Sequence, residues 1–418
     1  MGSFLSGLHR NWVILNPPVV PKEKHALRFG ILGAANIAPT AFITPAKSHP
    51  EVVVYAVAAR DKTRATAFAA KHYIPLVLDS YDEILDNDEI DAVYIPLPIR
   101  LHYEWALKAL AKGKHVLLEK SATSNASDTE RLFRHPILTQ PSNNQDRPVL
   151  LEAFHNRFTP AWQLFQSTID PPNVAHVLAT AAVPSFVVGD DDIRFNFQLG
   201  GGALLDLGTY PVAGLRASFA AEPTACIEAS MEVMPPPRER CDHTFHARFS
   251  FPNGGVGEIR GTMRAPNTRL GLPTITVTHR PVAVPAAEAG EEEGAQVIKT
   301  RKVIFWNFMF SPHYHRVDVV DTFEVRRAPT EAVRTFERTE HKKAYTFREM
   351  DVDQPGGVHW STYRHMLEQF VHKVRGRDGT GTWVSPEDSI AQARAMDMIY
   401  IKSGVGTRDP SAYKDESI

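Results

Sequence analysis

Short apolar runs alternate with helical patterns over the first part of the chain. The runs occupy residues 27–33, 51–60, 90–98, 114–120 and 148–154. Amphipathic stretches such as 61–72 and 101–113 lie between them. Apolar runs of this length, separated by helices, are typical of parallel strands that are buried on both faces of a sheet. The pattern predicts a doubly wound α/β domain.

The pattern changes after residue 154, where longer alternating strands become frequent. They occupy residues 174–183, 245–265 and 274–284. Asn253 and Gly254 interrupt the second of these segments and predict a hairpin, because both residues tolerate a positive φ. This part is predicted to be an α+β domain with a large open, mainly antiparallel sheet.

The remaining segments complete the predicted architecture. Residues 1–26 are interpreted as an N-terminal arm that is extended from residue 12, because prolines interrupt it. The acidic stretch 285–296 is interpreted as a solvated, mobile loop. Near the end, a helix is expected over 360–376, and another begins after Ser385, which is followed by proline and two acids as helix starts prefer.

Length and composition narrow the class of protein. A chain of 418 residues exceeds the usual size of one core, so the division into domains is placed near residue 152. Lys and Arg number 46 against 48 Asp and Glu, which gives no field to recruit nucleic acid or an anionic membrane. The two cysteines cannot form a disulfide framework, and no segment has the length and apolarity of a membrane span. A soluble, cytoplasmic protein is expected.

The first apolar run ends in a turn of small residues. Gly33 is followed by Ala34, Ala35, Asn36 and Ile37, and then by a predicted helix. Such a turn lets a pyrophosphate approach the backbone N–H groups at a helix N-terminus. Since only Gly33 keeps glycine among the three usual positions, a tight strand-to-helix turn with no ligand stays an alternative.

The second apolar run ends in Arg60, Asp61 and Lys62. In a dinucleotide fold this strand end meets the adenosine ribose, where an acid suits NAD and an arginine pairs with the 2′-phosphate of NADP. Arg60 therefore favours NADP, with Arg64 as a second contact. The alternative is that Arg60 is a solvated charge and Asp61 merely caps the next helix.

Two further motifs carry a resemblance to a known family. Glu119 and Lys120 end an apolar run, and residues 200–212 read GGGALLDLGTYPV. Together with the turn at Gly33 and with Arg60, these motifs resemble the glucose-fructose oxidoreductase/inositol dehydrogenase (Gfo/Idh/MocA) family, from about Asn11 to the last helix. Within it, the chain is most similar to the fungal branch of the dimeric dihydrodiol dehydrogenases and NADP-dependent D-xylose dehydrogenases.

The resemblance implies a Rossmann doubly wound parallel sheet that binds the dinucleotide over residues 27–152 and an α+β domain for substrate binding and dimerisation over 153–418. It also implies three catalytic residues: Lys120, Asp206 and Tyr210. Lys120 is expected beside the nicotinamide, where its ammonium would stabilise an oxyanion and lower the pKa of the neighbouring phenol. Taken singly, each of these residues is more often a surface lysine, a turn cap or a core tyrosine.

The same resemblance implies further contacts. Pro96, Leu97, His102 and Glu119 are expected near the cofactor together with Gly33, Ala35, Asn36, Ile37, Arg60 and Lys120, and His155 and Arg157 are expected at the substrate. His102 could equally be an ordinary helix-start residue, and Arg157 could be structural. Ser121 stands where the family usually has proline, often in a cis peptide bond. His313 and His315 are interpreted as core or surface residues, and no metal site is expected.

These expectations combine into one functional hypothesis. The chain is predicted to be a homodimeric NADP-dependent oxidoreductase that transfers a hydride between the nicotinamide and a hydroxyl or carbonyl carbon of a sugar or trans-dihydrodiol. The alternatives are an oxidoreductase of a biosynthetic pathway that acts on a larger natural product, a non-catalytic dinucleotide-binding regulator, and a glycosidase with transient redox chemistry. The glycines 200–202 would allow either close approach to a ligand or a tight turn.

Overall fold

The first sheet has six parallel strands in the order β3-β2-β1-β4-β5-β6. The strands are β1 Leu27–Leu32, β2 Val52–Ala58, β3 Leu76–Leu78, β4 Ala92–Ile95, β5 His115–Leu118 and β6 Leu150–Glu152. The computed structural model describes residues 2–140, 147–266, 271–328 and 331–415. The doubly wound prediction is confirmed, with one strand more than the apolar runs indicated, because β3 is only three residues long.

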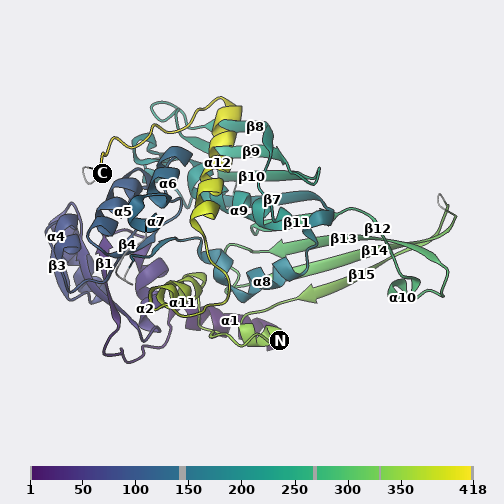
Figure 1. Ribbon diagram of the computed structural model, residues 1–418, viewed down its shortest axis with the longest axis horizontal. Coiled ribbons are helices and arrows are strands. Elements are labelled where there is room, and N and C mark those ends of the chain that lie inside the picture. The colour runs from purple at the N-terminus through teal and green to yellow at the C-terminus, as the bar shows by residue number, and fades with distance from the viewer. Residues whose placement is uncertain (1, 141–146, 267–270, 329–330, 416–418) are drawn as a thin grey trace.

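Helices cover both faces of this sheet (Figure 1). They are α2 Thr44–Lys47, α3 Lys62–His72, α4 Tyr81–Asp86, α5 His102–Ala111, α6 Ala126–Phe133 and α7 Pro136–Thr139. One face packs on α5 and α6 through Leu107 and Leu132. The opposite face packs on α11 (Thr362–Val374), where the rings of Phe29 and Phe370 are 5.8 Å apart. A helix from the C-terminal part of the chain therefore completes the core of the first sheet.

The second sheet is larger and mainly antiparallel, as predicted. Its strands run in the order β15-β14-β13-β11-β7-β10-β9-β8, with β12 paired to β13, and only β7 and β10 are parallel. The bounds are β7 Val174–Pro184, β8 Ala225–Val233, β9 Asp242–Ser250, β10 Val256–Ala265, β11 Thr274–His279, β12 Val282–Val284, β13 Gln296–Trp306, β14 Arg316–Ala328 and β15 Glu331–Lys342. Figure 1 shows β13, β14 and β15 extending away from the first sheet.

Three helices pack around the second sheet: α8 Pro160–Ser167, α9 Thr209–Phe219 and α12 Pro386–Ser403. Helix α12 contacts β8, α9 and α6, so it touches both parts of the molecule (Figure 1). Its predicted start is confirmed, since the Ser385 side chain accepts from the Asp388 N–H and Pro386 takes the first helical position. The hairpin at Asn253 and Gly254 is also confirmed, because β9 and β10 pair antiparallel on either side of it.

Two segments differ from the sequence prediction. The arm contains a helix, α1 Gly2–Leu15, which is held to the second part of the chain by Arg10 Nε, 3.0 Å from the Pro312 carbonyl oxygen, and by the buried Ile14. The acidic stretch 285–296 contains a short helix, α10 Ala286–Ala289. Buried Ala289 packs in a small apolar cluster with Phe323, and Glu288 pairs with Lys299, so local contacts order this stretch.

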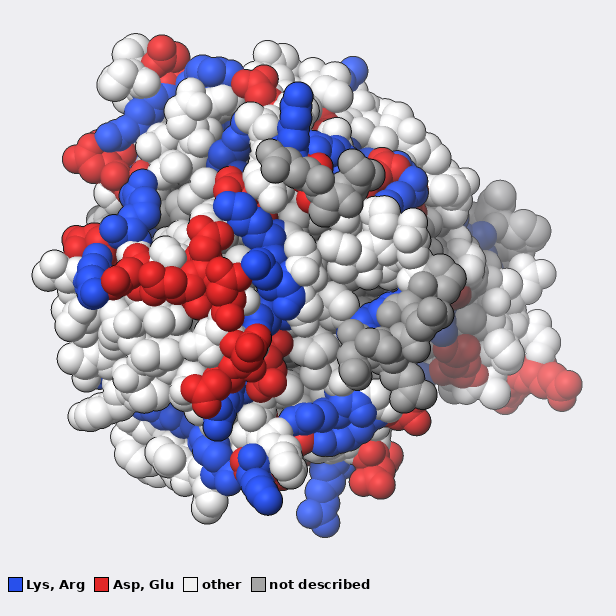
Figure 2. Space-filling view, turned by 60° about the vertical axis from the view of Figure 1, so that its left-hand side comes forward, with Lys and Arg blue, Asp and Glu red and all other residues white. Residues whose placement is uncertain are grey.

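Charges of both signs lie interspersed on the face shown in Figure 2. Ion pairs form along and between helices, as in Lys108–Glu104 on α5 and Arg394–Glu130 between α12 and α6. Over the part of the chain that the structure describes, no helix combines the length and apolarity needed to cross a membrane.

Candidate functional site

The carboxyl ends of the first sheet's strands meet at one edge because all six strands are parallel. Gly33 follows β1, Arg60 follows β2, Pro96 follows β4, and Glu119 and Lys120 follow β5. In open α/β sheets, ligands bind at this edge. The backbone topology therefore collects the predicted cofactor residues on one side of the molecule.

Lys120, just after β5 of the first sheet, contacts Asp206 from the C-terminal part of the chain. Its Nζ lies 2.7 Å from Oδ1 of Asp206 and 2.7 Å from the Asp206 backbone oxygen. Asp206 sits in a π-helical turn, Leu204–Gly208, immediately before α9. The other carboxylate oxygen of Asp206 accepts from Arg194 Nε at 3.0 Å. Burial raises the pKa of Asp206, but the charges of Lys120 and Arg194 outweigh it and hold the pKa below its ordinary value.

The glycines 200–202 place this turn by packing tightly. Gly202 has φ +139, and a Cβ there would collide with the side chains of Asp242 and Arg408. Its N–H donates to the Arg194 carbonyl oxygen at 2.8 Å, and Asp242 Oδ2 accepts from the Leu204 N–H at 2.6 Å. The close packing at Gly201 and Gly202 supports the tight-turn alternative. This turn brings Arg194 and Asp206 together.

Tyr210, on α9, lies beside Lys120. The Lys120 Nζ is 5.3 Å from the centroid of the Tyr210 ring, and the phenol oxygen is 2.8 Å from Nε2 of His155. Burial raises the pKa of Tyr210 well above its usual range, and the nearby Tyr363, Glu119 and Asp206 raise it further. The expectation that Lys120 lowers this pKa is therefore wrong, because the ammonium is already paired with Asp206 and the phenol is desolvated.

His155 supports Tyr210 from the short helix His155–Phe158. The imidazole is fully buried, its ring centroid is 4.0 Å from that of Tyr363, and burial lowers its pKa to about 3, with Lys120 adding to the effect. The ring is therefore neutral. Its Nδ1 has no hydrogen-bond partner within the described residues.

Arg157 is not brought to this cluster. Its Nη1 lies 2.5 Å from Oδ2 of Asp388, in the first turn of α12. Asp388 also pairs with Arg216 of α9 at 2.8 Å. This geometry supports the structural alternative for Arg157, because its guanidinium links two elements behind the Lys120 cluster.

Glu119 and His102 are buried beside the loops that follow β4 and β5. Glu119 Oε1 accepts from the Tyr94 hydroxyl at 2.7 Å, and burial raises the pKa of Glu119 although Lys120 opposes this. His102 is fully buried, with its ring nitrogens 2.9 Å from the Ser121 carbonyl oxygen and 2.7 Å from that of Leu97. Burial lowers the pKa of His102 to about 4, so the ring is neutral and its one N–H donates to one of these two carbonyl oxygens. Enclosed between the two loops, the ring is not free for the cofactor contact that we expected. The Lys120–Ser121 peptide bond is cis.

The turn after β1 is formed by small residues and by a glycine with a positive φ. Gly33 has φ +105, and a Cβ there would lie 3.1 Å from Leu97 Cδ2, so glycine fits this position best. Ala35 is half-buried, and Asn36 and Ile37 are exposed at the start of the following helix. Pro96 and Leu97 are buried beside the turn.

Two arginines flank this turn. Arg64 Nη2 donates to the Ala34 carbonyl oxygen at 2.8 Å, and Arg60 is exposed at the end of β2. The Asp61 carboxylate caps α3 by accepting from the Thr63 and Arg64 N–H groups. The Asp61 carboxylate is therefore engaged in capping α3. The charged side chains that stay beside the turn are those of Arg60 and Arg64. This arrangement fits a dinucleotide that carries an extra phosphate on its ribose.

Sequence reasoning missed three residues of the cluster: Tyr94, Arg194 and Tyr363. Tyr94 lies on β4, opposite Leu117 of β5 and two residues before Pro96. The alternation of side chains along β4 is the one feature of the sequence that could have indicated its place near Glu119. Arg194 and Tyr363 come from distant segments and carry no local motif. Within the described residues, no group of three or more His, Cys, Asp or Glu side chains could hold a metal ion. His313 and His315 bond to Asn11 and to the Ser311 backbone, in line with the structural role expected for them.

Comparisons with known proteins agree with this architecture. Residues 27–136 match the oxidoreductase family with an NAD-binding Rossmann fold (GFO_IDH_MocA), and residues 173–279 match the GFO/IDH/MocA C-terminal domain. The mouse trans-1,2-dihydrobenzene-1,2-diol dehydrogenase (Mus musculus) is 30% identical over 58% of this chain and 71% of its own length. A dTDP-3,4-didehydro-2,6-dideoxy-alpha-D-glucose 3-reductase from Saccharopolyspora spinosa is 40% identical over 46% of this chain and 55% of its own.

A D-xylose 1-dehydrogenase (NADP(+)) 2 from Haloferax volcanii is 37% identical over 46% of this chain and 56% of its own length. The chain spans a little over half the length of several of these relatives. Among solved structures, the 3-ketoreductase KijD10 from Actinomadura kijaniata, in complex with NADP and TDP-benzene, has a TM-score of 0.63 at 23% identity, over 90% of this chain and 98% of its own. This likeness concerns the fold, and the narrower fungal assignment stays a prediction. By its two matched domains and its diol dehydrogenase relative, the chain belongs to the Gfo/Idh/MocA oxidoreductase family.

Proposed function

We propose that this protein is an NADP-dependent oxidoreductase that transfers a hydride between the nicotinamide and a hydroxyl or carbonyl carbon of a sugar or trans-dihydrodiol. The observation that carries the proposal is the Lys120 ammonium, paired with Asp206 and lying 5.3 Å from the Tyr210 ring centroid, at the carboxyl edge of the first sheet. Relatives that are named D-xylose 1-dehydrogenase and dihydrodiol dehydrogenase support the substrate class.

The cofactor proposal rests on the turn at Gly33 and the two arginines beside it. Arg60 and Arg64 supply positive charge, while Asp61 is tied into the cap of α3. A 2′-phosphate is therefore favoured over a free 2′-hydroxyl. NADP would supply or accept the hydride. The NADP bound to KijD10 and the printed name of the xylose dehydrogenase agree with this choice.

The side chains provide what the reacting oxygen needs. The Lys120 ammonium can stabilise negative charge on the substrate oxygen, while Asp206 and Arg194 fix its position. Because its pKa is raised, the Tyr210 phenol is protonated at neutral pH and can donate a proton to a carbonyl oxygen as the carbonyl is reduced. In the reverse direction the same proton would return to Tyr210, and the raised pKa makes the reduction the direction for which the phenol is already in the required protonation state. His155 holds the phenol oxygen at 2.8 Å in either direction.

We also propose that the protein is a cytoplasmic homodimer. Among the described residues, the edge strand β15 pairs only with β14, and an open sheet of this kind offers a surface for a second copy. Light scattering coupled to size exclusion, at several concentrations, tests the proposal. A mass near twice 46.6 kDa is expected, and a mass of 46.6 kDa at every concentration would contradict it.

The functional proposal is tested by cofactor titration followed by a substrate panel. Protein fluorescence should show tighter binding of NADP than of NAD. The panel contains aldoses, trans-dihydrodiols, and nucleotide-linked keto sugars of the kind named for the S. spinosa relative. Turnover should vanish in Lys120→Met with NADP binding retained, while Lys112→Met, an exposed lysine on another face, serves as the matched control. Binding of NADP without turnover of any substrate would favour the regulatory alternative.

A further inference from the structure

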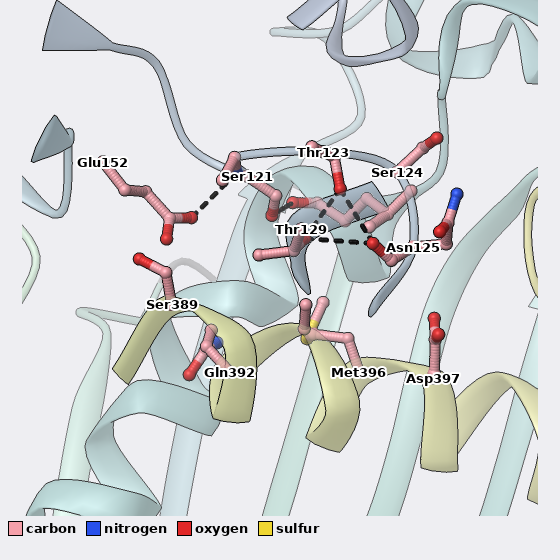
Figure 3. A pocket seen from close by; sticks show the side chains of 13 residues that line it. Ser121, Thr123, Ser124, Asn125, Thr129, Glu152, Ser389, Gln392, Met396 and Asp397 are labelled. Atoms are coloured by element: carbon pink, nitrogen blue, oxygen red, sulfur yellow. Dashed lines mark hydrogen bonds between the residues drawn. The ribbon is translucent and has the colours of Figure 1, made fainter. Parts of the chain in front are cut away.

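The loop that follows Lys120 spans a small buried cavity between the first sheet and α12 (Figure 3). Polar side chains line it, among them Thr123, Asn125, Glu152, Ser389, Gln392 and Asp397. The cavity has room for about one water molecule. The segment that carries Lys120 therefore borders, through Ser121 and Ala122, a cavity that has both apolar and polar lining residues.

Glu152 connects this loop to the sheet. It is the last residue of β6, the strand next to β5, and its side chain is 2% exposed. Oε1 accepts from the Ala122 N–H at 2.8 Å, two residues after Lys120 (Figure 3). Among the described residues, Glu152 Oε2 has no well-formed hydrogen bond; the Ser389 hydroxyl is its candidate donor, and both residues line the same cavity. One half of the carboxyl group thus holds the loop, and the other half faces the cavity.

The groups around Glu152 leave it without a cation of its own. The positive charge of Arg216 on α9 acts on Glu152, but this arginine is paired with Glu222 and with Asp388 of α12. Arg157 is also paired with Asp388. Burial therefore dominates and raises the pKa of Glu152 to about 7, with Asp388 adding to the rise and Ser389, Ala122 and Arg216 opposing it.

We propose that Glu152 is a positioning residue for Lys120, and that gain or loss of its proton shifts the Lys120–Ala122 segment and with it the ammonium. This inference rests on the proposed function. The neutral acid can accept from Ala122 and donate into the cavity at the same time. The carboxylate binds the Ala122 N–H more strongly, but it also places a buried negative charge behind the loop. Water that enters the cavity to hydrate this charge shifts the carboxylate, and the segment bound to it moves as well.

Asp397 provides a matched control in the same cavity. Its Oδ2 accepts from the Ala126 N–H at 2.9 Å, at the far end of the loop. Burial raises its pKa to about 6, with the Ala126 N–H and Arg408 opposing the rise and Asp128 adding to it. Asp397 therefore resembles Glu152 in lining the cavity and in its bond to backbone, but it is only half-buried and holds a residue farther from Lys120.

The test compares wild type, Glu152→Gln and Asp397→Asn in kcat and KM for the proposed reaction at about pH 6 and about pH 8.5. Glutamine is similar in shape and can still accept from Ala122, but it does not titrate. In the wild type and in Asp397→Asn, kcat at about pH 8.5 is expected to be lower than at about pH 6 by roughly threefold or more, with KM little changed. In Glu152→Gln, kcat should be nearly the same at the two pH values. Glu152→Asp, which keeps a titrating group, should keep the fall with a lower kcat at both pH values.

A second readout does not need turnover. Hydrogen exchange over residues 120–126, corrected for intrinsic rates, should show protection that decreases at the higher pH in the wild type and stays constant in Glu152→Gln. If Glu152→Gln keeps the wild-type pH response in kcat and in exchange, the inference is overturned while the proposed function stands. If no substrate turns over but the exchange pattern is as expected, the proposed function fails and the role of Glu152 in placing the loop is retained.

Discussion

The two ends of the candidate site are built in different ways. At the cofactor end, the turn at Gly33 is made of backbone and small residues, and Arg60 is exposed. At the reaction end, Lys120 and Asp206 are 12% and 27% exposed, and Tyr210 and His155 are buried against each other. The first end can bind a ligand by local contacts, whereas the second depends on side chains that fix one another across both sheets.

The largest expected effect of a substitution is at the reaction end. Tyr210→Phe removes the proton donor and leaves the Lys120 ammonium in place, so kcat should fall by about 10³-fold. NADP affinity should stay within about twofold, because the phenol lies away from the turn at Gly33. Steady-state kinetics and fluorescence titration check this, with Tyr73→Phe, an exposed tyrosine, as control. Near-wild-type kcat would remove Tyr210 from the mechanism.

The next effect is the pH dependence of protein stability that is caused by Glu152. The folded-state pKa of Glu152, about 7, exceeds the ordinary carboxyl value, so the folded protein binds more protons than the unfolded chain between these values. The proton on Glu152 contributes at most about 3 kcal/mol to the free energy of unfolding. The whole contribution is present below the pKa of the unfolded chain, and it is lost as the pH rises through about 7. Glu152→Gln should therefore lose less stability than the wild type between pH 5 and pH 8.5 in urea unfolding. Parallel curves for the two proteins would contradict it.

At the cofactor end, smaller effects are expected because several groups share the ligand. Arg60→Ala and Arg64→Ala should each weaken NADP binding by about tenfold, since each removes one charge-assisted contact with the 2′-phosphate. NAD binding should be little changed. Equal losses for NADP and NAD would show that these arginines do not read the 2′-phosphate.

The smallest effect is expected at the cap of α3. Asp61→Ala removes the acceptor for the Thr63 and Arg64 N–H groups and should lower the free energy of unfolding by about 1 kcal/mol. Asp61→Asn, which can still cap, should lose less. A loss of NADP discrimination in Asp61→Asn without a change in stability would assign Asp61 to the ligand.

The difference between the two ends also explains which features the sequence could predict. Gly33, Arg60 and the pair Glu119-Lys120 follow strands with clear apolar patterns, so their place at the sheet edge follows from parallel topology. Asp206 and Tyr210 were found through a family resemblance. The sequence does not predict helix α1, because the prolines that follow residue 16 favour an extended chain in this region. It does not predict β3 either, because three residues are too few for a pattern.

The supporting side chains could not be predicted because they depend on distant contacts. Tyr363 lies on α11, which was expected as a helix, but nothing in its pattern indicates that this helix packs on the first sheet beside His155. Arg194 reaches Asp206 through the tight packing of the glycines 200–202. His102 was assigned to the cofactor from its position, yet its buried ring bonds to the Leu97 and Ser121 backbone instead.

The account depends most on the place of the Lys120 ammonium relative to the nicotinamide. A crystal structure of the protein with NADP measures this directly. We predict the pyrophosphate at the Gly33 turn, the 2′-phosphate near Arg60, and the nicotinamide ring within about 5 Å of Lys120 Nζ, since hydride transfer requires the reacting groups to be in contact. A nicotinamide bound away from Lys120 and Tyr210 would contradict the proposed reaction.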